Sequence, residues 1–382
     1  MIVLYLFSSP EGDISLDPED LSRPFLVTPE KVHPHLTLGN YFDTVKACVL
    51  KDRGELLKCA LKSGSHEDFS LEDVRKIKIR SEKHGILYHL ASVEVFMVET
   101  HVKFTLSTAI SQKGVECITH EHNILDRLNH HSEFSFLPEI YGIRKMTCHT
   151  EQGKAEEMAM LAAQWFEDYH EWHMAMDPID GRTKIKIWDL KRGPRYASTT
   201  EASLIIEECS KILAFYYNRR DFSHIGSWHH AAGDFIVNTQ RNGTLNIRLT
   251  TVRKYEPPPA TKDANPTIAI IYFFLDTTLH MRLDRLDGVG ETVWLDDFAV
   301  TAAVKGIFKG LRAQEARGDG VAGVRADDLL TLMQSFDAPE LKRVFAPLLA
   351  HYRAQHSDEA ALISTRLDSH ISILRRALQD FH

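Results

Sequence analysis

The chain has little cysteine and no long apolar run. Its five cysteines are scattered along 382 residues, odd in number, and without a Cys-x-x-Cys pair. This pattern does not fit a disulfide framework and favours a reducing compartment. The longest strongly apolar run, residues 268–275 (IAIIYFFL), covers eight residues, far fewer than the roughly 20 that a helix needs to cross a bilayer. We therefore expect a cytoplasmic protein without a membrane span.

The chain also has no excess of positive charge. Its 45 Lys and Arg residues are outnumbered by 53 Asp and Glu residues, for a formal net charge of −8. This balance argues against a broad basic face, so we expect no nucleic-acid partner. The apolar start lacks the basic segment of a signal peptide, and a first strand is expected there instead. The composition, with 43% hydrophobic and 26% charged residues, is that of a globular protein long enough for two lobes.

The first half of the chain is expected to form a sheet with a helix. Residues 1–75 form an N-terminal extension that ends in a helical pattern, with Gly54 as the expected break. Residues 76–110 alternate and are rich in β-branched and aromatic side chains, which predicts three antiparallel strands. A helical pattern follows at 114–129, and two further strands are expected near 136–143 and 160–169.

The second half is expected to be mainly helical. A helical region is followed by a long helix over 199–220, whose apolar stripe begins after a possible threonine cap. The segment SWHHAAGDFIVN (227–238) follows, and then an Asn242-Gly243 turn joins two strands in a hairpin. A Pro-rich connection at 255–266 precedes helices that continue to residue 382. The whole pattern predicts an α+β protein.

This order of elements resembles the bilobal protein-kinase-like fold. The resemblance implies an N-lobe over 76–168, with an antiparallel sheet, one helix and the hinge, and a mainly helical C-lobe over 169–382. It concerns topology and several positions rather than intact motifs. Within that superfamily the chain is similar to diverged members, either pseudokinase-like or atypical bacterial kinases of small molecules or lipopolysaccharide.

The resemblance assigns nucleotide-binding roles to five residues. Lys103, in the third strand (HVKF), would bind phosphates and pair with Glu121 on the following helix. A lysine on the surface of a strand and a solvated glutamate on a helix would explain the same two residues without a nucleotide site. Gln164, Trp165 and Phe166 occupy the hinge position, where an adenine ring would lie, although a strand that ends in a loop predicts them equally well.

The segment at 227–238 resembles a degenerate catalytic loop. Asp234 takes the position of the family's metal-binding Asn, and a carboxylate is a suitable Mg²⁺ ligand. The general-base position falls on His229, with Asp221 and His224 as upstream alternatives. A structural explanation remains open for His230, whose imidazole could support the loop by hydrogen bonds to backbone carbonyls.

Two features of the family are missing. A threonine, Thr250 or Thr251, stands where the main metal-binding Asp is expected, and a hydroxyl is a poor substitute for its charge. Only Gly85 lies between the first two strands, so Lys83, His84 or His89 would have to assist phosphate binding. A displaced carboxylate could restore the metal site, and Glu256 is the nearest downstream candidate.

Three functions remain open. The first is a pseudokinase-like nucleotide-binding or scaffold protein, with ATP and Mg²⁺ as expected ligands and a protein partner or a second copy of the chain as the expected assembly. The second is an atypical ATP-dependent phosphotransferase or nucleotidyl transferase. The third is a metal-dependent hydrolase built on histidines, among them His170 and His173, which lie three residues apart.

Overall fold

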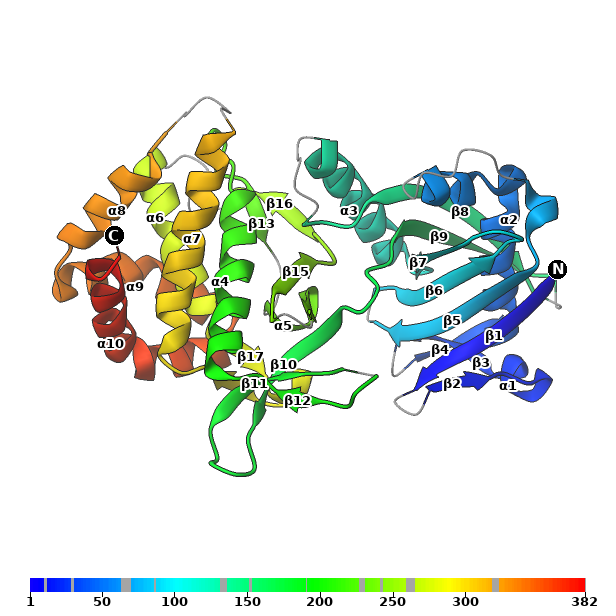
Figure 1. The fold of residues 1–382 in the computed structure, drawn as a ribbon, viewed down its shortest axis with the longest axis horizontal. Helices are drawn as coiled ribbons and strands as arrows, with labels where there is room; N and C mark the ends of the chain where they lie inside the picture. The colour runs from blue at the N-terminus through cyan, green and yellow to red at the C-terminus, as the bar shows by residue number, and fades with distance from the viewer. Residues whose placement is uncertain are drawn as a thin grey trace. The chain divides into compact units, whose positions relative to one another are not determined.

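The computed structural model describes residues 1–9, 12–28, 31–62, 70–85, 87–130, 136–150, 153–189, 191–226, 231–240, 243–258, 265–317 and 323–381. These residues form two compact units, Met1–Glu167 and Asp168–His382. Each unit has its own sheet and helices, and each is described by itself (Figure 1).

Unit 1 is organised around a seven-stranded sheet in the order β2-β1-β5-β6-β7-β9-β8. The strands are β1 (Ile2–Ser9), β2 (Gly12–Ser15), β5 (Lys76–His84), β6 (His89–Phe96), β7 (His101–Ala109), β8 (Ile140–His149) and β9 (Ala155–Gln164). The neighbouring strands from β5 to β8 are antiparallel, whereas β1 runs parallel to β5. The strands within residues 76–168 are therefore antiparallel, as expected, and β1 of the N-terminal extension makes the sheet as a whole mixed.

The sheet of unit 1 has helices on both faces. The other elements of the unit are α1 (Pro18–Ser22), the hairpin of β3 (Pro24–Thr28) and β4 (Lys31–Thr37), α2 (Leu38–Lys62), the short η1 (Leu71–Asp73) and α3 (Gln112–His130). Within the expected N-lobe, residues 76–168, α3 is the one helix among the described residues, as predicted, and α1, α2 and η1 belong to the N-terminal extension. The kink of α2 runs from Lys51 to Gly54, where three residues have positive φ, which confirms the predicted break.

Alternation along β7 separates a core face from a polar face. Phe104 and Leu106 are fully buried in the large cluster that includes α2. Successive side chains of a strand point to opposite faces, so Lys103 shares the other face with Ala109. Ala109 packs with Ile118 of α3. The register of β7 therefore puts Lys103 on the face of the sheet that α3 covers.

Unit 2 contains a five-stranded sheet in the order β12-β11-β10-β14-β15 and two small pairs, β13–β16 and β17–β18. Its strands are β10 (His170–Met176), β11 (Thr183–Ile187), β12 (Arg195–Tyr196), β13 (His224–Gly226), β14 (Phe235–Thr239), β15 (Leu245–Leu249), β16 (Lys254–Glu256), β17 (Leu283–Arg285) and β18 (Thr292–Trp294). The predicted hairpin is confirmed as β14–β15. The helical region expected before residue 199 was wrong, because β10, β11 and β12 occupy that stretch.

The C-terminal region of unit 2 is helical. Its helices are α4 (Thr199–Phe215), α5 (Ala231–Asp234), α6 (Pro266–His280), η3 (Leu286–Gly288), α7 (Phe298–Ala316), α8 (Ala326–Ser335), α9 (Ala338–Gln355) and α10 (Ser357–Gln379). Figure 1 shows α4 and α7 side by side, in close contact. Gly306 permits this approach, because a Cβ there would lie 2.1 Å from the carbonyl oxygen of Glu207.

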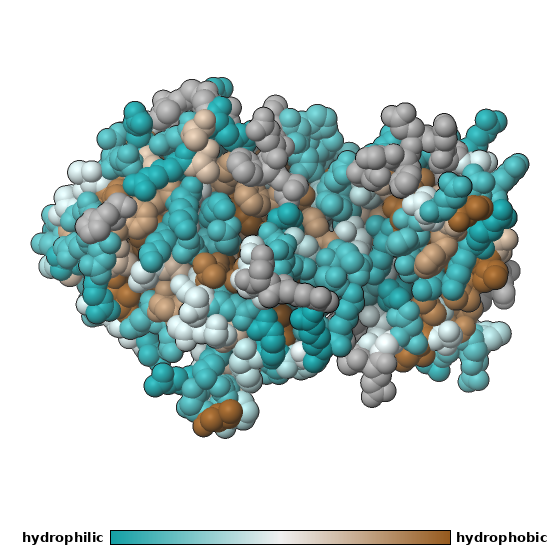
Figure 2. Space-filling view, viewed as in Figure 1, coloured by the Kyte–Doolittle hydropathy of each residue, from teal (hydrophilic) through white to brown (hydrophobic). Residues whose placement is uncertain are grey.

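The visible surface is mainly hydrophilic, and its hydrophobic atoms form small separate groups (Figure 2). Among the described residues, the most exposed large hydrophobic side chains are Ile179 and Val289, and both lie in turns. No helix in the described part of the chain is long and apolar enough to cross a membrane.

Candidate functional site

Along the chain, Asp234 lies between two paired strands, β13 before it and β14 after it. Asp234 closes the short α5 and is followed at once by β14, which pairs with β15. The strand before the loop, β13, pairs antiparallel with β16, which follows the hairpin. The β13–β16 pairing therefore places residues 224–226, which precede Asp234, beside residues 254–256, which follow the hairpin. His229 and His230, the expected base and supporting residue, lie outside the described residues.

The carboxylate of Asp234 is held by an arginine. Asp234 is buried, and both of its oxygens accept hydrogen bonds from the Arg253 guanidinium, at 2.6 and 2.8 Å. Such paired, charge-assisted bonds fix geometry as well as charge. The backbone of Asp234 is fixed too, because its carbonyl oxygen accepts bonds from the amide and the hydroxyl of Thr250, at 2.9 and 3.0 Å.

The positions expected to complete a metal site offer no second carboxylate close to Asp234. The Thr250 hydroxyl donates to the carbonyl of Asp234. Glu256 lies in β16, where its side chain is 61% exposed and 3.4 Å from the Lys254 ammonium. Among the described residues, no group of three or more His, Cys, Asp or Glu could hold a metal ion. With Arg253 in place, the described residues around Asp234 therefore offer no donor set that fits Mg²⁺.

A histidine next to Gly233, the residue before Asp234, pairs with an aspartate. His173 of β10 is buried, and its Nδ1 is 3.3 Å from the carboxylate of Asp284 in β17. Asp284 also accepts the backbone N–H of Met174 at 2.7 Å. The His173 ring packs on Trp188 and on the α-carbon of Gly233. This pair supports the loop backbone next to Asp234.

The two upstream base candidates have local structural partners. Asp221 is exposed, and its carboxylate accepts the backbone N–H of Ser223 at 2.9 Å. The ring of His224 packs between Tyr217 and Phe273, and its Nδ1 is 3.2 Å from the carbonyl of Phe222. Burial lowers the pKa of His224, so the neutral imidazole is favoured. These contacts are typical of a turn for Asp221 and of a packed aromatic ring for His224.

In unit 1, two of the nucleotide-binding candidates lie together. The Lys103 ammonium is 4.0 Å from the centroid of the Trp165 ring and 3.6 Å from the carboxylate of Glu167. The Trp165 indole N–H donates to the same carboxylate at 2.9 Å. Gln164 is the last residue of β9, and its backbone N–H donates to Glu139 at 2.8 Å. Phe166, two residues beyond β9, is half-buried.

Glu121 is the buried carboxylate of α3, and it accepts a hydrogen bond of 2.6 Å from the Tyr88 hydroxyl. Tyr88 lies in the β5–β6 connection, where a phosphate-binding loop is expected. The histidines expected to assist there, His84 and His89, instead share a hydrogen bond of 2.7 Å between their Nδ1 atoms. His89 is buried in contact with Tyr41 of α2, which places it on the core face.

The histidines of β10 do not converge. His170 lies 3.6 Å from Asp189, whereas His173 pairs with Asp284. Residues three apart on a strand point to opposite faces. The described residues therefore give no support to a metal-dependent hydrolase built on these two side chains.

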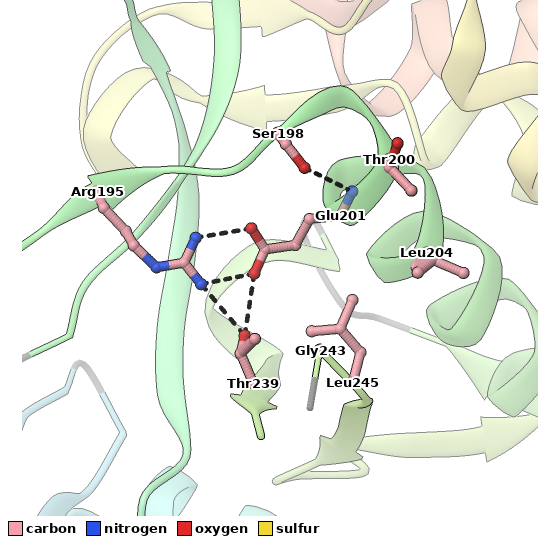
Figure 3. A pocket seen from close by; sticks show the side chains of 8 residues that line it. All are labelled: Arg195, Ser198, Thr200, Glu201, Leu204, Thr239, Gly243 and Leu245. Carbon is pink, nitrogen blue, oxygen red and sulfur yellow. Dashed lines mark hydrogen bonds and ion pairs between the residues drawn. The ribbon is translucent and has the colours of Figure 1, made fainter. Parts of the chain in front are cut away.

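A pocket of about 390 Å³ opens at the start of α4 (Figure 3). It is lined by Arg195, Ser198, Thr200, Glu201, Leu204, Thr239, Gly243 and Leu245. Arg195 points across the pocket to Glu201 and Thr239, with two bonds to the carboxylate at 2.6 and 2.7 Å. The carboxylate offsets the arginine charge. Thr239 is at the end of β14 opposite to Asp234, so the pocket includes no predicted site residue.

No protein-family model matches the chain, and no curated protein matches it. Any role for the residues of the candidate site therefore has to be argued from the geometry of this structure. Sequence reasoning missed Arg253 and Asp284. Arg253 lies three residues after Thr250 in TTVRKYE, and a basic residue so close to the missing metal-binding Asp was a usable signal. Asp284 carries no such signal, because 110 residues separate it from Met174.

Proposed function

We propose that this chain is a kinase-like nucleotide-binding or scaffold protein of the pseudokinase type. The observation that carries the proposal is in unit 1. Three successive antiparallel strands end in β7, which carries Lys103, and the next helix, α3, carries the buried Glu121. In kinase-like proteins these two positions hold the lysine and the glutamate that organise the nucleotide phosphates.

Unit 2 supports the proposal through its order of elements. The long α4 leads through β13 into the loop that ends at Asp234, and the β14–β15 hairpin follows directly. The chain then returns as β16 beside β13. A kinase-like catalytic loop and the metal-binding position after its hairpin would occupy this same order, with Asp234 and Thr250 at the two metal positions.

The surroundings of Asp234 favour a pseudokinase over a phosphotransferase. Phosphoryl transfer depends on metal ions and cations that neutralise developing charge. Here Asp234 is bound by Arg253, and threonines replace the second carboxylate. Glu256, the displaced carboxylate that would favour an enzyme, pairs with Lys254 and is mostly exposed. None of these contacts favours the transferase alternative.

The test is ATP binding by calorimetry and thermal shift, with and without Mg²⁺. We expect the wild type to bind ATP and Lys103→Ala to weaken binding by about tenfold or more, a loss of about 1.4 kcal/mol or more. Lys76→Ala is the matched control, since Lys76 is a lysine of β5 in the same sheet whose ammonium lies over Phe96. No ATP binding by the wild type under either condition would reject a nucleotide site and leave a scaffold.

A further inference from the structure

The buried carboxylate of Asp234 requires a positive partner. Its side chain is 11% exposed, and a buried charge without a partner is strongly unfavourable. Arg253 supplies that charge through two hydrogen bonds, one to each carboxylate oxygen. Both oxygens that could coordinate a metal ion therefore already accept bonds from a cation of the protein.

The backbone holds both members of this pair in place. On the side of Asp234, Phe235 pairs with Leu249 in the hairpin, and Thr250 binds the Asp234 carbonyl twice. Arg253 is followed at once by β16, which is anchored to β13. Strand pairing next to each residue therefore restricts the backbone of both members of the pair.

We propose that the Arg253 guanidinium takes the place of a divalent metal ion at Asp234, so that the nucleotide-class ligand binds without a metal. The proposal rests on the function proposed above for the identity of the ligand. Its physical basis is that Mg²⁺ needs oxygen ligands, and both carboxylate oxygens of Asp234 already accept hydrogen bonds from Arg253. Arginine carries a permanent positive charge and presents it in a planar fork that suits carboxylates and phosphates.

The first experiment uses Mn²⁺ alone, followed by electron paramagnetic resonance, with no nucleotide present. We expect no Mn²⁺ binding that depends on Asp234 in the wild type. Arg253→Gln removes the resident cation, and we expect it to bind Mn²⁺ at least about tenfold more tightly than the wild type. Adding Asp234→Asn to Arg253→Gln should abolish that gain. Saturable Mn²⁺ binding by the wild type that Asp234→Asn removes would overturn the proposal.

A charge-preserving variant covers the case in which Arg253→Gln does not fold. Arg253→Lys keeps a cation beside Asp234 but loses the fork. We expect it to fold and, like the wild type, to show no Asp234-dependent Mn²⁺ binding. If Arg253→Lys instead bound Mn²⁺ through Asp234, a positive charge at residue 253 would not be what excludes the metal, and the proposal would fail.

The second experiment measures ADP and ATP binding in EDTA and in Mg²⁺. For the wild type we expect affinities that agree within about twofold, a difference of well under 1 kcal/mol. Binding that appears only with Mg²⁺ would overturn the inference but leave the proposed function standing. If no nucleotide binds under either condition, the nucleotide-binding form of the proposed function fails and only the scaffold form is left, and the Mn²⁺ experiment still decides which cation Asp234 holds.

Discussion

The imidazole of His173 lies directly against the α-carbon of Gly233, the residue before Asp234. A Cβ at position 233 would come 3.2 Å from Cε1 of His173. Gly233 also has a φ of 82°, in the region that disfavours other L-residues. The loop next to Asp234 therefore needs a residue without a side chain for two reasons, one local and one set by a neighbouring strand.

We expect Gly233→Ala to lower the free energy of unfolding of unit 2 by about 2–4 kcal/mol, because backbone strain and steric overlap add. Gly193→Ala is the matched control, since Gly193 has a φ of 88° but a Cβ there would meet nothing within 4 Å. It should lose only about 1–2 kcal/mol. Urea unfolding measures both, and equal losses would show that His173 does not restrict the loop.

Gly306→Ala is expected to separate α4 from α7. The new methyl group would collide with the Glu207 carbonyl oxygen, which belongs to the rigid backbone of α4. We expect a loss of about 2–3 kcal/mol, although alanine favours a helix over glycine. Lys305→Ala, at an exposed neighbouring position of α7, should change stability by less than about 0.5 kcal/mol. Thermal unfolding of the two variants is the measurement, and a stabilised Gly306→Ala would contradict the close packing.

Unit 1 should lose stability on acidification through His89. Burial, together with the neighbouring His84, lowers the pKa of His89 from 6.5 to about 3. Between these values the unfolded chain binds the proton and the folded chain does not, so the free energy of unfolding falls as the pH decreases from about 6.5 towards 3. This histidine alone accounts for at most about 5 kcal/mol.

The measurement is urea unfolding of His89→Gln between pH 7 and pH 4, values that bracket the expected titration. A side chain that does not titrate should flatten the pH dependence of stability. His101→Gln is the control, because His101 lies exposed at the start of β7 in the same sheet, and it should keep the pH dependence of the wild type. Identical profiles for all three proteins would contradict a neutral, buried His89.

The cysteines should react with thiol reagents in two classes. Cys48, Cys148 and Cys209 are buried, whereas Cys59 and Cys117 are partly exposed. Burial raises the pKa of the Cys48 thiol to about 11, so little reactive thiolate forms near neutral pH. We expect labelling of the native protein, followed by mass spectrometry, to modify Cys59 and Cys117 first and Cys48 only after unfolding. Rapid native labelling of Cys48 would contradict its burial.

Many elements follow from local patterns in the sequence. The helix α3 is marked by apolar residues at helical spacing, of which Ile118, Ile124 and Leu125 prove buried. Alternation marks β5, β6 and β7, and glycine residues mark the break in α2 and the β14–β15 turn. These predictions succeed because periodicity and turn chemistry depend on residues close together in the chain. The strands at 170–196 were missed, although Thr183–Ile187 alternates, because a helical region was expected before residue 199.

The partners of the candidate site residues were decided by tertiary structure. The sequence determined which side chains could carry charge or coordinate a ligand, including Asp234, Lys103 and His173. It did not determine that Arg253 would hold Asp234, that Trp165 would lie over Lys103, or that His173 would meet Asp284. A buried polar group must find a partner, and strand pairing between distant segments decides which groups are near enough. No local pattern in the sequence contains that information, so only the tertiary structure decides which charged and polar groups interact at the site.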